Sequence, residues 1–399
     1  FFVKTKCNAY SVYHLYSFTT ECPATIVMGG CGATPLDLAI QCGSSLEVFR
    51  LLLKANPEAP GILDSSGQFP LWRAIRYRSP VSVMELLCNS REVVLTQEQK
   101  LGRTALHFAL EDSFSHKDDD VVKVMLRKAP RELPLVASRC GGTSLDFCCQ
   151  YYVRTIRTVK LVTTDSTQSS KKDFTNMTTQ SQRRWRTCCL LLRAVCDGTV
   201  PNDNDTLLQP DNSQYDSNVS SGINDATSFC VLHAALVTDC KFAAQIVETA
   251  LALYPWQARE RDKQGRYPLH IALDSCQSVK TKNQVLPMLL NAYPEVAKLK
   301  IPDTLVLVAQ HSDLTLSNLQ KIIAAVPPES FRKPDPATGL FPFMVAASNN
   351  QSTTSNMMAL QDRISNQFES YFSLDPDLLH ITAIFEMLLL APDLVSLHL

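Results

Sequence analysis

Several features that would assign this 399-residue chain to a familiar class are missing from it. It has no apolar run near the roughly 18 residues that a membrane-spanning helix needs. Its 38 basic and 39 acidic residues leave a net charge of −1, which gives no general attraction to nucleic acid or to an anionic membrane. Apolar residues make up 45% of the chain, enough for a sizeable core. We therefore expect a soluble globular or solenoid protein.

Cysteine is too sparse for a disulfide-built scaffold, at 14 residues in 399. No Cys-x-x-Cys pair occurs. Cys148, Cys189 and Cys196 stand among apolar residues, where a free cysteine behaves as a small hydrophobic side chain. We therefore expect free thiols and a reducing compartment.

Short segments with a shared pattern recur along the chain. In each, a glycine or its substitute is followed four residues later by an apolar anchor, and three residues beyond the anchor by alanine or an equivalent. The best copies span residues 32–39, 67–74, 102–109 and 265–272, and weaker ones span 141–148, 228–235, 302–309 and 339–346. The anchors are Leu36, Leu71, Leu106, Leu145, Leu232, Leu269, Val306 and Phe343, at spacings of 35, 35, 39, 87, 37, 37 and 37. These spacings indicate an internal repeat, with about 50 extra residues in the fourth unit.

A proline marks the end of most periods. It follows the last aliphatic residue of a helix-like run by four positions, as at Leu53/Pro57, Leu126/Pro130, Leu251/Pro255, Leu290/Pro294, Ile323/Pro327 and Leu388/Pro392. Because proline cannot continue a helix, each period is predicted to hold a turn, a short helix, a loop and a longer second helix. Helix starts are expected near Thr34, Pro70, Thr104, Pro268 and Pro342. One such helix pair cannot bury its own apolar faces, whereas stacked neighbours can.

The turn and the start of the first helix resemble the ankyrin-repeat signature, Gly-x-Thr-Pro-Leu-His-x-Ala at about 33 residues per period. The best copies are Gly102–Ala109 and Gly265–Ala272. The likeness covers essentially the whole chain, although periods of 35 to 39 and a Pro-Glu-Ala-like end to the second helix depart from the signature. It implies an all-α fold, a solenoid of ankyrin-like helix pairs with short turns or β-hairpins between them.

The predicted organisation follows from the anchors and from stretches rich in Ser, Thr, Asn and Asp. Residues 1–23 form a half-repeat or cap, residues 24–154 hold repeats one to four (first part), and residues 187–197 form the second helix of repeat four. Mobile insertions are expected at 155–186 and 198–226. Repeats five to eight (first part) follow at 227–347, then an insertion at 348–378 and a C-terminal helix at 379–399.

Candidate catalytic and metal-binding patterns are weak. The resemblance implies that His107, His233 and His270 are structural, and they lie in different units with no shared ligand set. Gly29–Gly32 lacks the Gly-Lys-Ser/Thr of a phosphate loop, and Asp118–Asp120 falls where negative charge favours a helix start. Neither His-Glu-x-x-His nor Gly-x-Ser-x-Gly occurs. We therefore expect a protein that is not an enzyme and that holds no metal or other cofactor.

Two basic clusters have the layout of a bipartite nuclear import signal. The first is Lys171 and Lys172, and the second, after ten residues, is Arg183, Arg184 and Arg186 around Trp185. Such clusters are weak patterns. The alternative is a solvated start to the second helix of repeat four, with Trp185 packing back onto the fold. We expect a cytoplasmic protein, with nuclear import as the alternative.

Protein binding is the function that the repeat implies, because stacked turns and first helices form a long concave face whose non-core positions are free to vary. By family position, the residues of this face are Ser65, Ser66, Gln68, Arg76 and Tyr77; Lys100, Arg103, Glu111 and Asp112; and Lys263, Gln264, Arg266 and Asp274. Trp72 and Tyr77 are the predicted aromatic anchors. We expect a monomer that binds one or more protein partners, with no nucleic acid and no membrane in this segment.

Two other hypotheses stay open. The chain begins Phe1-Phe2-Val3 without methionine, so it is also consistent with a fragment. It would then be a regulatory or substrate-recruiting arm of a larger enzyme, such as a kinase or a ubiquitin ligase, or the cytosolic arm of a membrane protein. The full-length reading frame would distinguish these hypotheses from a free-standing scaffold.

Overall fold

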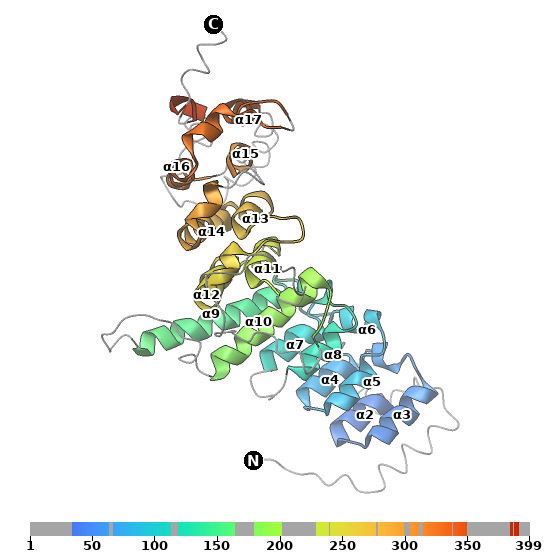
Figure 1. The fold of residues 1–399 in the computed structure, drawn as a ribbon. Coiled ribbons are helices and arrows are strands. Elements are labelled where there is room, and N and C mark those ends of the chain that lie inside the picture. Colours follow the sequence, from blue (N-terminus) through green and yellow to red (C-terminus); the bar gives the residue numbers. More distant parts are fainter. Residues whose placement is uncertain are drawn as a thin grey trace, which may run out of the picture. The chain divides into compact units, whose positions relative to one another are not determined.

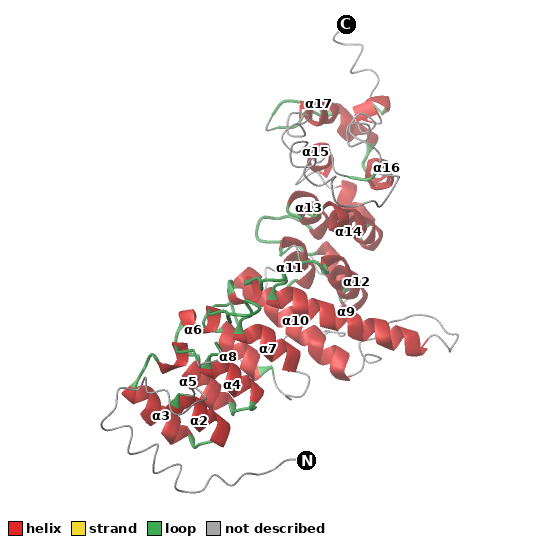
Figure 2. Cartoon of the chain, turned by 180° about the vertical axis from the view of Figure 1, so that it is seen from behind, coloured by secondary structure: helices red, strands yellow, loops and turns green. Residues whose placement is uncertain are grey.

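The computed structural model describes residues 34–63, 67–112, 119–163, 179–201, 229–238, 240–276, 278–298, 304–310, 314–336, 338–348, 384–385 and 387–390. Its contacts divide the chain into two units, residues 1–215 and residues 216–399, each of which is a series of helix pairs (Figure 1). Within the described ranges the elements are helices and loops without a strand (Figure 2), and one isolated antiparallel bridge joins Ala137 to Thr143. The expected helical repeat architecture is confirmed.

The described part of the first unit holds four helix pairs. Its first helices are α2 (Pro35–Cys42), α4 (Pro70–Arg76), α7 (Ala105–Asp112) and α9 (Ser144–Thr163), and each packs on the next in this order. Its second helices are α3 (Leu46–Ala55), α5 (Val81–Leu87), α8 (Asp120–Leu126) and α10 (Thr179–Asp197), and a short helix α6 (Arg91–Leu95) follows α5. The first helices therefore form one layer and the second helices α3, α5 and α8 form another.

The second unit repeats this plan. Its first helices are α11 (Val231–Val237), α13 (Pro268–Asp274), α15 (Thr304–Gln310) and α17 (Pro342–Ser348), again packed in sequence order. Its second helices are α12 (Ala243–Leu253), α14 (Val279–Ala292) and α16 (Leu316–Ala325). Stacking of neighbours in sequence order is the arrangement that buries the apolar face of each pair.

The predicted helix starts are confirmed. Thr34 caps α2, since its hydroxyl accepts from the Asp37 N–H while the Asp37 carboxylate accepts from the Thr34 N–H. This reciprocal pair satisfies two backbone donors that a helix start leaves free. The helices α4, α13 and α17 begin at their prolines, and α7 begins one residue after Thr104.

The anchor residues form the core of each unit. Leu36, Leu71, Leu106, Leu145, Leu232 and Leu269 are all at most 2% exposed. Val306 is 9% exposed and lies on α15, which packs against α13 and α17, so the unit without a turn glycine is a full repeat as predicted. Phe343 is half-buried, and its ring stacks on Phe341 at 6.1 Å between centroids.

A single-turn 3-10 helix follows the proline that ends most second helices, and the sequence pattern did not predict it. These short helices are η1 (Ala59–Gly61), η2 (Leu133–Leu135), η4 (Pro255–Arg259), η5 (Pro294–Lys298) and η6 (Pro328–Arg332). Each carries a buried apolar side chain, such as Leu133, Val296 or Phe331, back onto the core. The proline therefore ends the second helix and starts a second, tighter turn.

The fourth repeat departs from the prediction of an insertion at 155–186. Helix α9 continues to Thr163 and α10 begins at Thr179, so the two ends of that range are helical. The longer helices pack on each other, with the rings of Tyr152 and Trp185 5.0 Å apart and both side chains fully buried. Burial of this aromatic pair outweighs the polar composition that indicated a loop. Residues 164–178 lie outside the described residues.

Other predicted boundaries are covered only in part. Helix α17 ends at Ser348, one residue beyond the predicted end of the last repeat at 347. The described part of 379–399 is residues 384–385 and 387–390, and all of these but residue 390 are helical. The predicted cap at 1–23 lies outside the described residues, as do residues 202–226 of the insertion predicted at 198–226 and residues 349–378 of the one predicted at 348–378.

Candidate protein-interaction surface

The turns that precede the first helices are linked to one another by the backbone. Gly102 has a φ of 63°, and a Cβ atom there would lie 2.9 Å from Arg139 Cγ. Next to it, the Arg139 N–H donates to the Leu101 carbonyl at 2.8 Å, and the Gln97 side chain donates to the Ala137 carbonyl. Glycine is required at residue 102 because the next turn approaches this closely and the backbone is left-handed.

The three repeat histidines join neighbouring repeats. His107 Nδ1 accepts from the Thr104 N–H at 3.1 Å, and its Nε2 lies 3.4 Å from the Gly142 carbonyl in the next turn. His270 accepts from the Tyr267 N–H, and its Nε2 contacts Thr304 Oγ1 at 3.0 Å. His233 Nε2 lies 3.2 Å from the Glu260 carbonyl. The structural role that the resemblance implied agrees with these contacts.

Burial fixes the charge state of these histidines. It lowers the pKa of His107 to about 4 and that of His270 to about 4, and it lowers the pKa of His233 below its usual value. The neutral ring is therefore the native form, with one nitrogen accepting and the other free to donate. Across the described part of the chain, no group of three His, Cys, Asp or Glu side chains could hold a metal ion.

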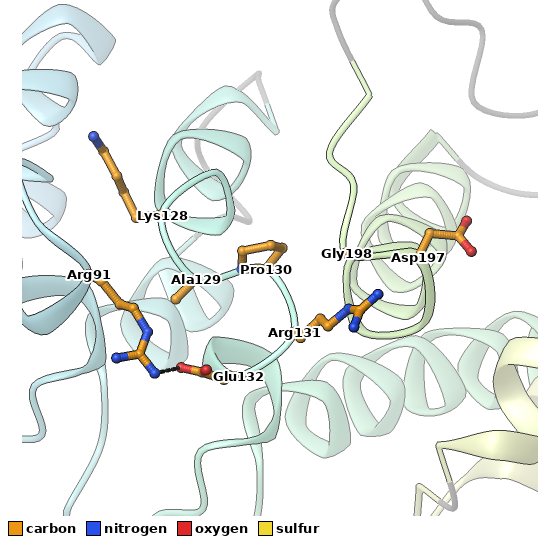
Figure 3. Close-up of a pocket in the computed structure, with 8 residues that line it drawn as sticks. All are labelled: Arg91, Lys128, Ala129, Pro130, Arg131, Glu132, Asp197 and Gly198. Atoms are coloured by element: carbon orange, nitrogen blue, oxygen red, sulfur yellow. Dashed lines mark hydrogen bonds and ion pairs between the residues drawn. The ribbon is translucent and has the colours of Figure 1, made fainter.

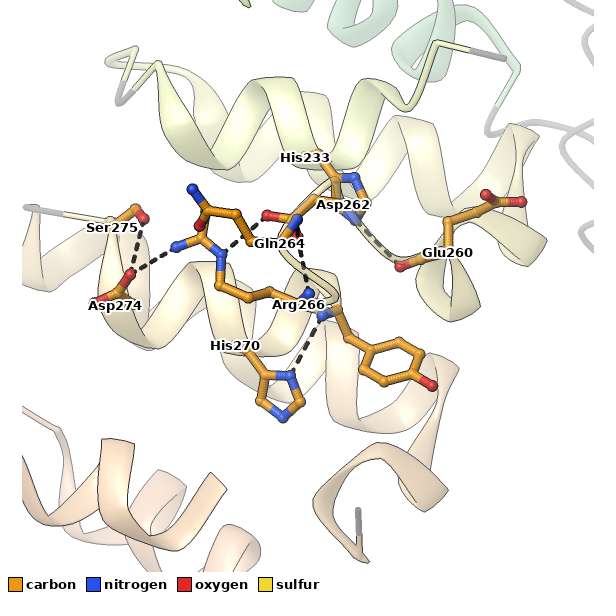
Figure 4. A network of polar contacts seen from close by, with 9 residues as sticks. His233, Glu260, Asp262, Gln264, Arg266, His270, Asp274 and Ser275 are labelled. Atoms are coloured by element: carbon orange, nitrogen blue, oxygen red, sulfur yellow. Dashed lines mark hydrogen bonds and ion pairs between the residues drawn. The ribbon is translucent and has the colours of Figure 1, made fainter. Parts of the chain in front are cut away.

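Four of the predicted surface residues form ion pairs with each other. Arg103 Nη1 lies 2.7 Å from Glu111 Oε1, and Arg266 Nη1 lies 2.7 Å from Asp274 Oδ2. In both repeats the arginine follows the turn glycine and the carboxylate lies in the last turn of the first helix. Figure 4 shows that Arg266 also contacts Asp262, at 2.9 Å, so one guanidinium ties the turn to the helix end.

The remaining predicted residues divide by exposure. Arg76, Tyr77, Lys100, Lys263 and Gln264 are exposed, and the Tyr77 side chain retains 52% of its accessible area. Gln68 is half-buried. Ser65 and Ser66 lie outside the described residues, and Asp112 ends α7 but its side chain is likewise not described.

Trp72 was predicted as an aromatic anchor for a partner, and this prediction is wrong. Its side chain is only 4% exposed, and its ring lies 3.8 Å from that of Phe108 on α7. The apolar face of the indole is used for packing between α4 and α7. Trp72 therefore stabilises the stack and cannot present its ring to a partner.

Two exposed residues of this surface were missed. Leu101, at the tip of a turn, is 43% exposed. Arg78, just after α4, has a φ of 53°, in the left-handed region that a non-glycine residue rarely adopts. Its N–H donates to the Ile75 carbonyl, and the Ser79 N–H donates to the Ala74 carbonyl, which closes the helix. The Pro80 that follows was the available signal for a helix end here.

The second half of the candidate import signal lies in a helix and not in an exposed loop. Arg183, Arg184 and Arg186 are all part of α10. Arg184 Nη1 donates to the Tyr151 carbonyl at 2.8 Å and to Thr155 Oγ1, and Trp185 is fully buried. The alternative reading, a helix start with Trp185 packed back, is the one observed. Lys171 and Lys172 lie outside the described residues.

The acidic run was expected to favour a helix start. Helix α8 begins at Asp120, and the carboxylate of Asp119 accepts from Thr187 Oγ1 of α10 at 2.8 Å. Burial raises the pKa of Asp119, against the opposing effect of that hydrogen bond. Asp118 and Gly29–Gly32 lie outside the described residues.

Comparison with known protein families matches residues 36–133 to ankyrin repeats, in three copies. The matched range runs from α2 to the start of η2 and holds the first helices α2, α4 and α7. Among the described helices, none is both long and apolar enough to cross a membrane. Ankyrin repeats are generally modules for protein–protein interaction. This chain therefore carries ankyrin repeats at residues 36–133, and the paired helices of both its units are consistent with an ankyrin-repeat array.

Proposed function

We propose that the chain is a non-catalytic scaffold that binds a protein partner through the turns and first-helix ends of its repeats. A catalyst could use histidines as general acids or bases. Here the repeat histidines instead link neighbouring turns. The surface carries both charges, which suits a protein partner better than nucleic acid. Free thiols at eleven described cysteines support a reducing compartment such as the cytoplasm.

A single feature supports this proposal most strongly: the Arg-Tyr-Arg tip, formed by Arg76, Tyr77 and Arg78 at the end of α4. All three side chains are exposed. Left-handed backbone at a residue with a Cβ costs about 1–2 kcal/mol, and Arg78 carries this cost. Tyrosine and arginine are the residues that most often dominate binding energy at protein interfaces. The Arg78 backbone closes α4, whereas the exposed side chains of the three residues are open to a partner.

To test this proposal, peptide ligands would be selected against the whole chain, and their binding would then be compared between the original chain and substituted variants. A library of random peptides on phage would supply binders, and the affinity of one selected peptide would be measured for each variant. Tyr77→Ala should weaken binding by at least about tenfold, in line with the loss of a central aromatic contact.

The matched control is Leu51→Ala, because Leu51 is also a large exposed apolar residue, at 40%, but lies on the second helix α3. Leu51→Ala should leave the affinity unchanged, and circular dichroism should show both variants folded. If the peptide binds both variants as tightly as the original chain, or loses affinity only with Leu51→Ala, the proposed surface is wrong.

A further inference from the structure

The exposed charges of the first unit differ between its two layers. We call the turns and first helices of this unit the turn face. Among its described residues, the charged side chains that are exposed are all basic: Arg76, Arg78, Lys100, Arg139 and Arg154. The second helices and the segments after them expose both signs, as Figure 3 shows near η2, where Arg91 pairs with Glu132. The excess of exposed positive charge therefore lies on the face that carries the proposed partner surface.

The described carboxylates of the turn face are engaged in contacts within the fold. Asp37 and Asp146 are buried and accept from backbone N–H groups at the starts of α2 and α9. Glu98 is also buried, and it accepts from the Leu101 N–H at 3.1 Å. Glu111 forms the ion pair with the turn arginine described above. These groups are therefore not available to neutralise the exposed cations.

Two of the exposed cations lie together at the tips of neighbouring turns. Arg139 Nη1 donates to the Lys100 carbonyl at 3.3 Å, and the Arg139 N–H donates to the Leu101 carbonyl at 2.8 Å. Leu101 is itself exposed, so an apolar side chain stands beside two positive ones. Neither cation has an ion-pair partner among the described residues. We call these three residues the Lys-Leu-Arg tip.

We propose that the partner segment bound by the turn face is acidic, with aspartate or glutamate side chains near the Lys-Leu-Arg tip and the Arg-Tyr-Arg tip. This inference rests on the proposed function and names the class of partner for the same surface. The cations need not converge on one group, because complementary charge along a segment acts through the field of the whole face. The exposed Leu101 suits an apolar side chain beside the acidic ones, which a protein segment supplies and a nucleic-acid backbone does not.

The peptides selected from the random library provide the test. Aspartate and glutamate should outnumber lysine and arginine in their sequences. One acidic peptide, labelled with a fluorophore, would then be titrated with the whole chain and its variants. The double variant Lys100→Gln with Arg139→Gln should weaken binding about tenfold at low ionic strength, mainly by slowing association. The difference should shrink as the ionic strength rises, because exposed charges are screened by salt.

The matched control is the double variant Lys54→Gln with Arg127→Gln. It also removes two exposed cations, so the net charge is the same, but Lys54 lies on α3 and Arg127 directly follows α8, both in the layer of second helices. The control should change the affinity by less than about twofold. All four side chains are exposed, so both double variants should keep the original unfolding midpoint.

The inference is overturned if the selected peptides show no acidic excess, if the two double variants bind alike, or if selection yields no peptide. It is also overturned if a single-stranded oligothymidine displaces the acidic peptide at equal concentration, because the face would then bind nucleic acid. Tyr77→Ala separates this result from the proposed function. Loss of a peptide that is not acidic would refute only the acidic partner, whereas an acidic peptide that depends on Lys100 and Arg139 but not on Tyr77 would refute the Arg-Tyr-Arg tip.

Discussion

Mild acid should destabilise the repeats at their buried histidines. His107 and His270 have a pKa of about 4 in the folded chain, against 6.5 for an exposed imidazole. The unfolded chain therefore takes up protons first as the pH falls below 6.5, and it is stabilised relative to the folded chain. The stability that depends on the neutral rings is complete above pH 6.5 and is lost progressively down to about pH 4.

The size of the effect follows from these two values. Between pH 7.5 and pH 5.5, proton uptake by one unfolded histidine of this kind lowers the free energy of unfolding by about 1.3 kcal/mol. His107 and His270 lie in different units and share no partner, so their contributions should add to about 2.6 kcal/mol. The pKa of His233 is lowered in the same direction and adds to the loss.

The assay is urea unfolding of the original chain and of His270→Gln at both pH values, followed by circular dichroism. Glutamine keeps a donor for Thr304 but does not titrate, so this variant should lose about 1.3 kcal/mol less between the two pH values than the original chain. The comparison uses only the change with pH within each protein, so a general destabilisation by the substitution cancels. An equal change with pH in the two proteins would refute the reasoning.

Two further substitutions test the packing of the repeats. Leu269→Ala removes an anchor that is 1% exposed on α13, between α11 and α15, and should lower the free energy of unfolding by about 2–5 kcal/mol in urea melts. The control is Val237→Ala, at a 49% exposed position of α11, which should lower it by no more than about 0.5 kcal/mol. Equal losses would mean that the repeat phase is misassigned. Gly102→Ala should destabilise more than Gly141→Ala by about 1 kcal/mol, because both glycines are left-handed but only at residue 102 would a Cβ meet the next turn. A larger loss for Gly141→Ala would show that the contact with Arg139 does not constrain this turn.

The repeat pattern predicts the stacking, because its signals are local and recur. Glycine at the turn, proline or threonine at the helix start and an apolar anchor act within a few residues of one another. Their regular spacing also identified Val306 as an anchor where the turn glycine is absent. The 3-10 helices after the second-helix prolines were missed because a single turn has too few residues to show a hydrophobic period.

Tertiary contacts determine the features that the pattern could not predict. Trp72 occupies a position that varies between repeats, and only its contact with Phe108 decides that it is buried. In the fourth repeat, polar residues at the ends of α9 and α10 indicated a loop, but the pairing of the two helices extends both. Intrinsic preference is a weak prior where packing of this kind is available.

The ion pairs explain why the Arg-Tyr-Arg tip is the part of the surface that we propose for a partner. In two repeats the residue after the turn glycine is an arginine, and the carboxylate eight residues later neutralises it, as with Arg103 and Glu111. In the repeat of Gly67 the equivalent positions hold Gln68 and Arg76. These two side chains cannot form such an ion pair, and the arginine lies at the end of the helix instead of after the turn glycine. Arg76 has no ion-pair partner among the described residues. Within the described part of the chain, no carboxylate therefore neutralises this charge beside the exposed ring of Tyr77. In the complex that we propose, an acidic group on the partner would complete here the pair that the other two repeats make internally.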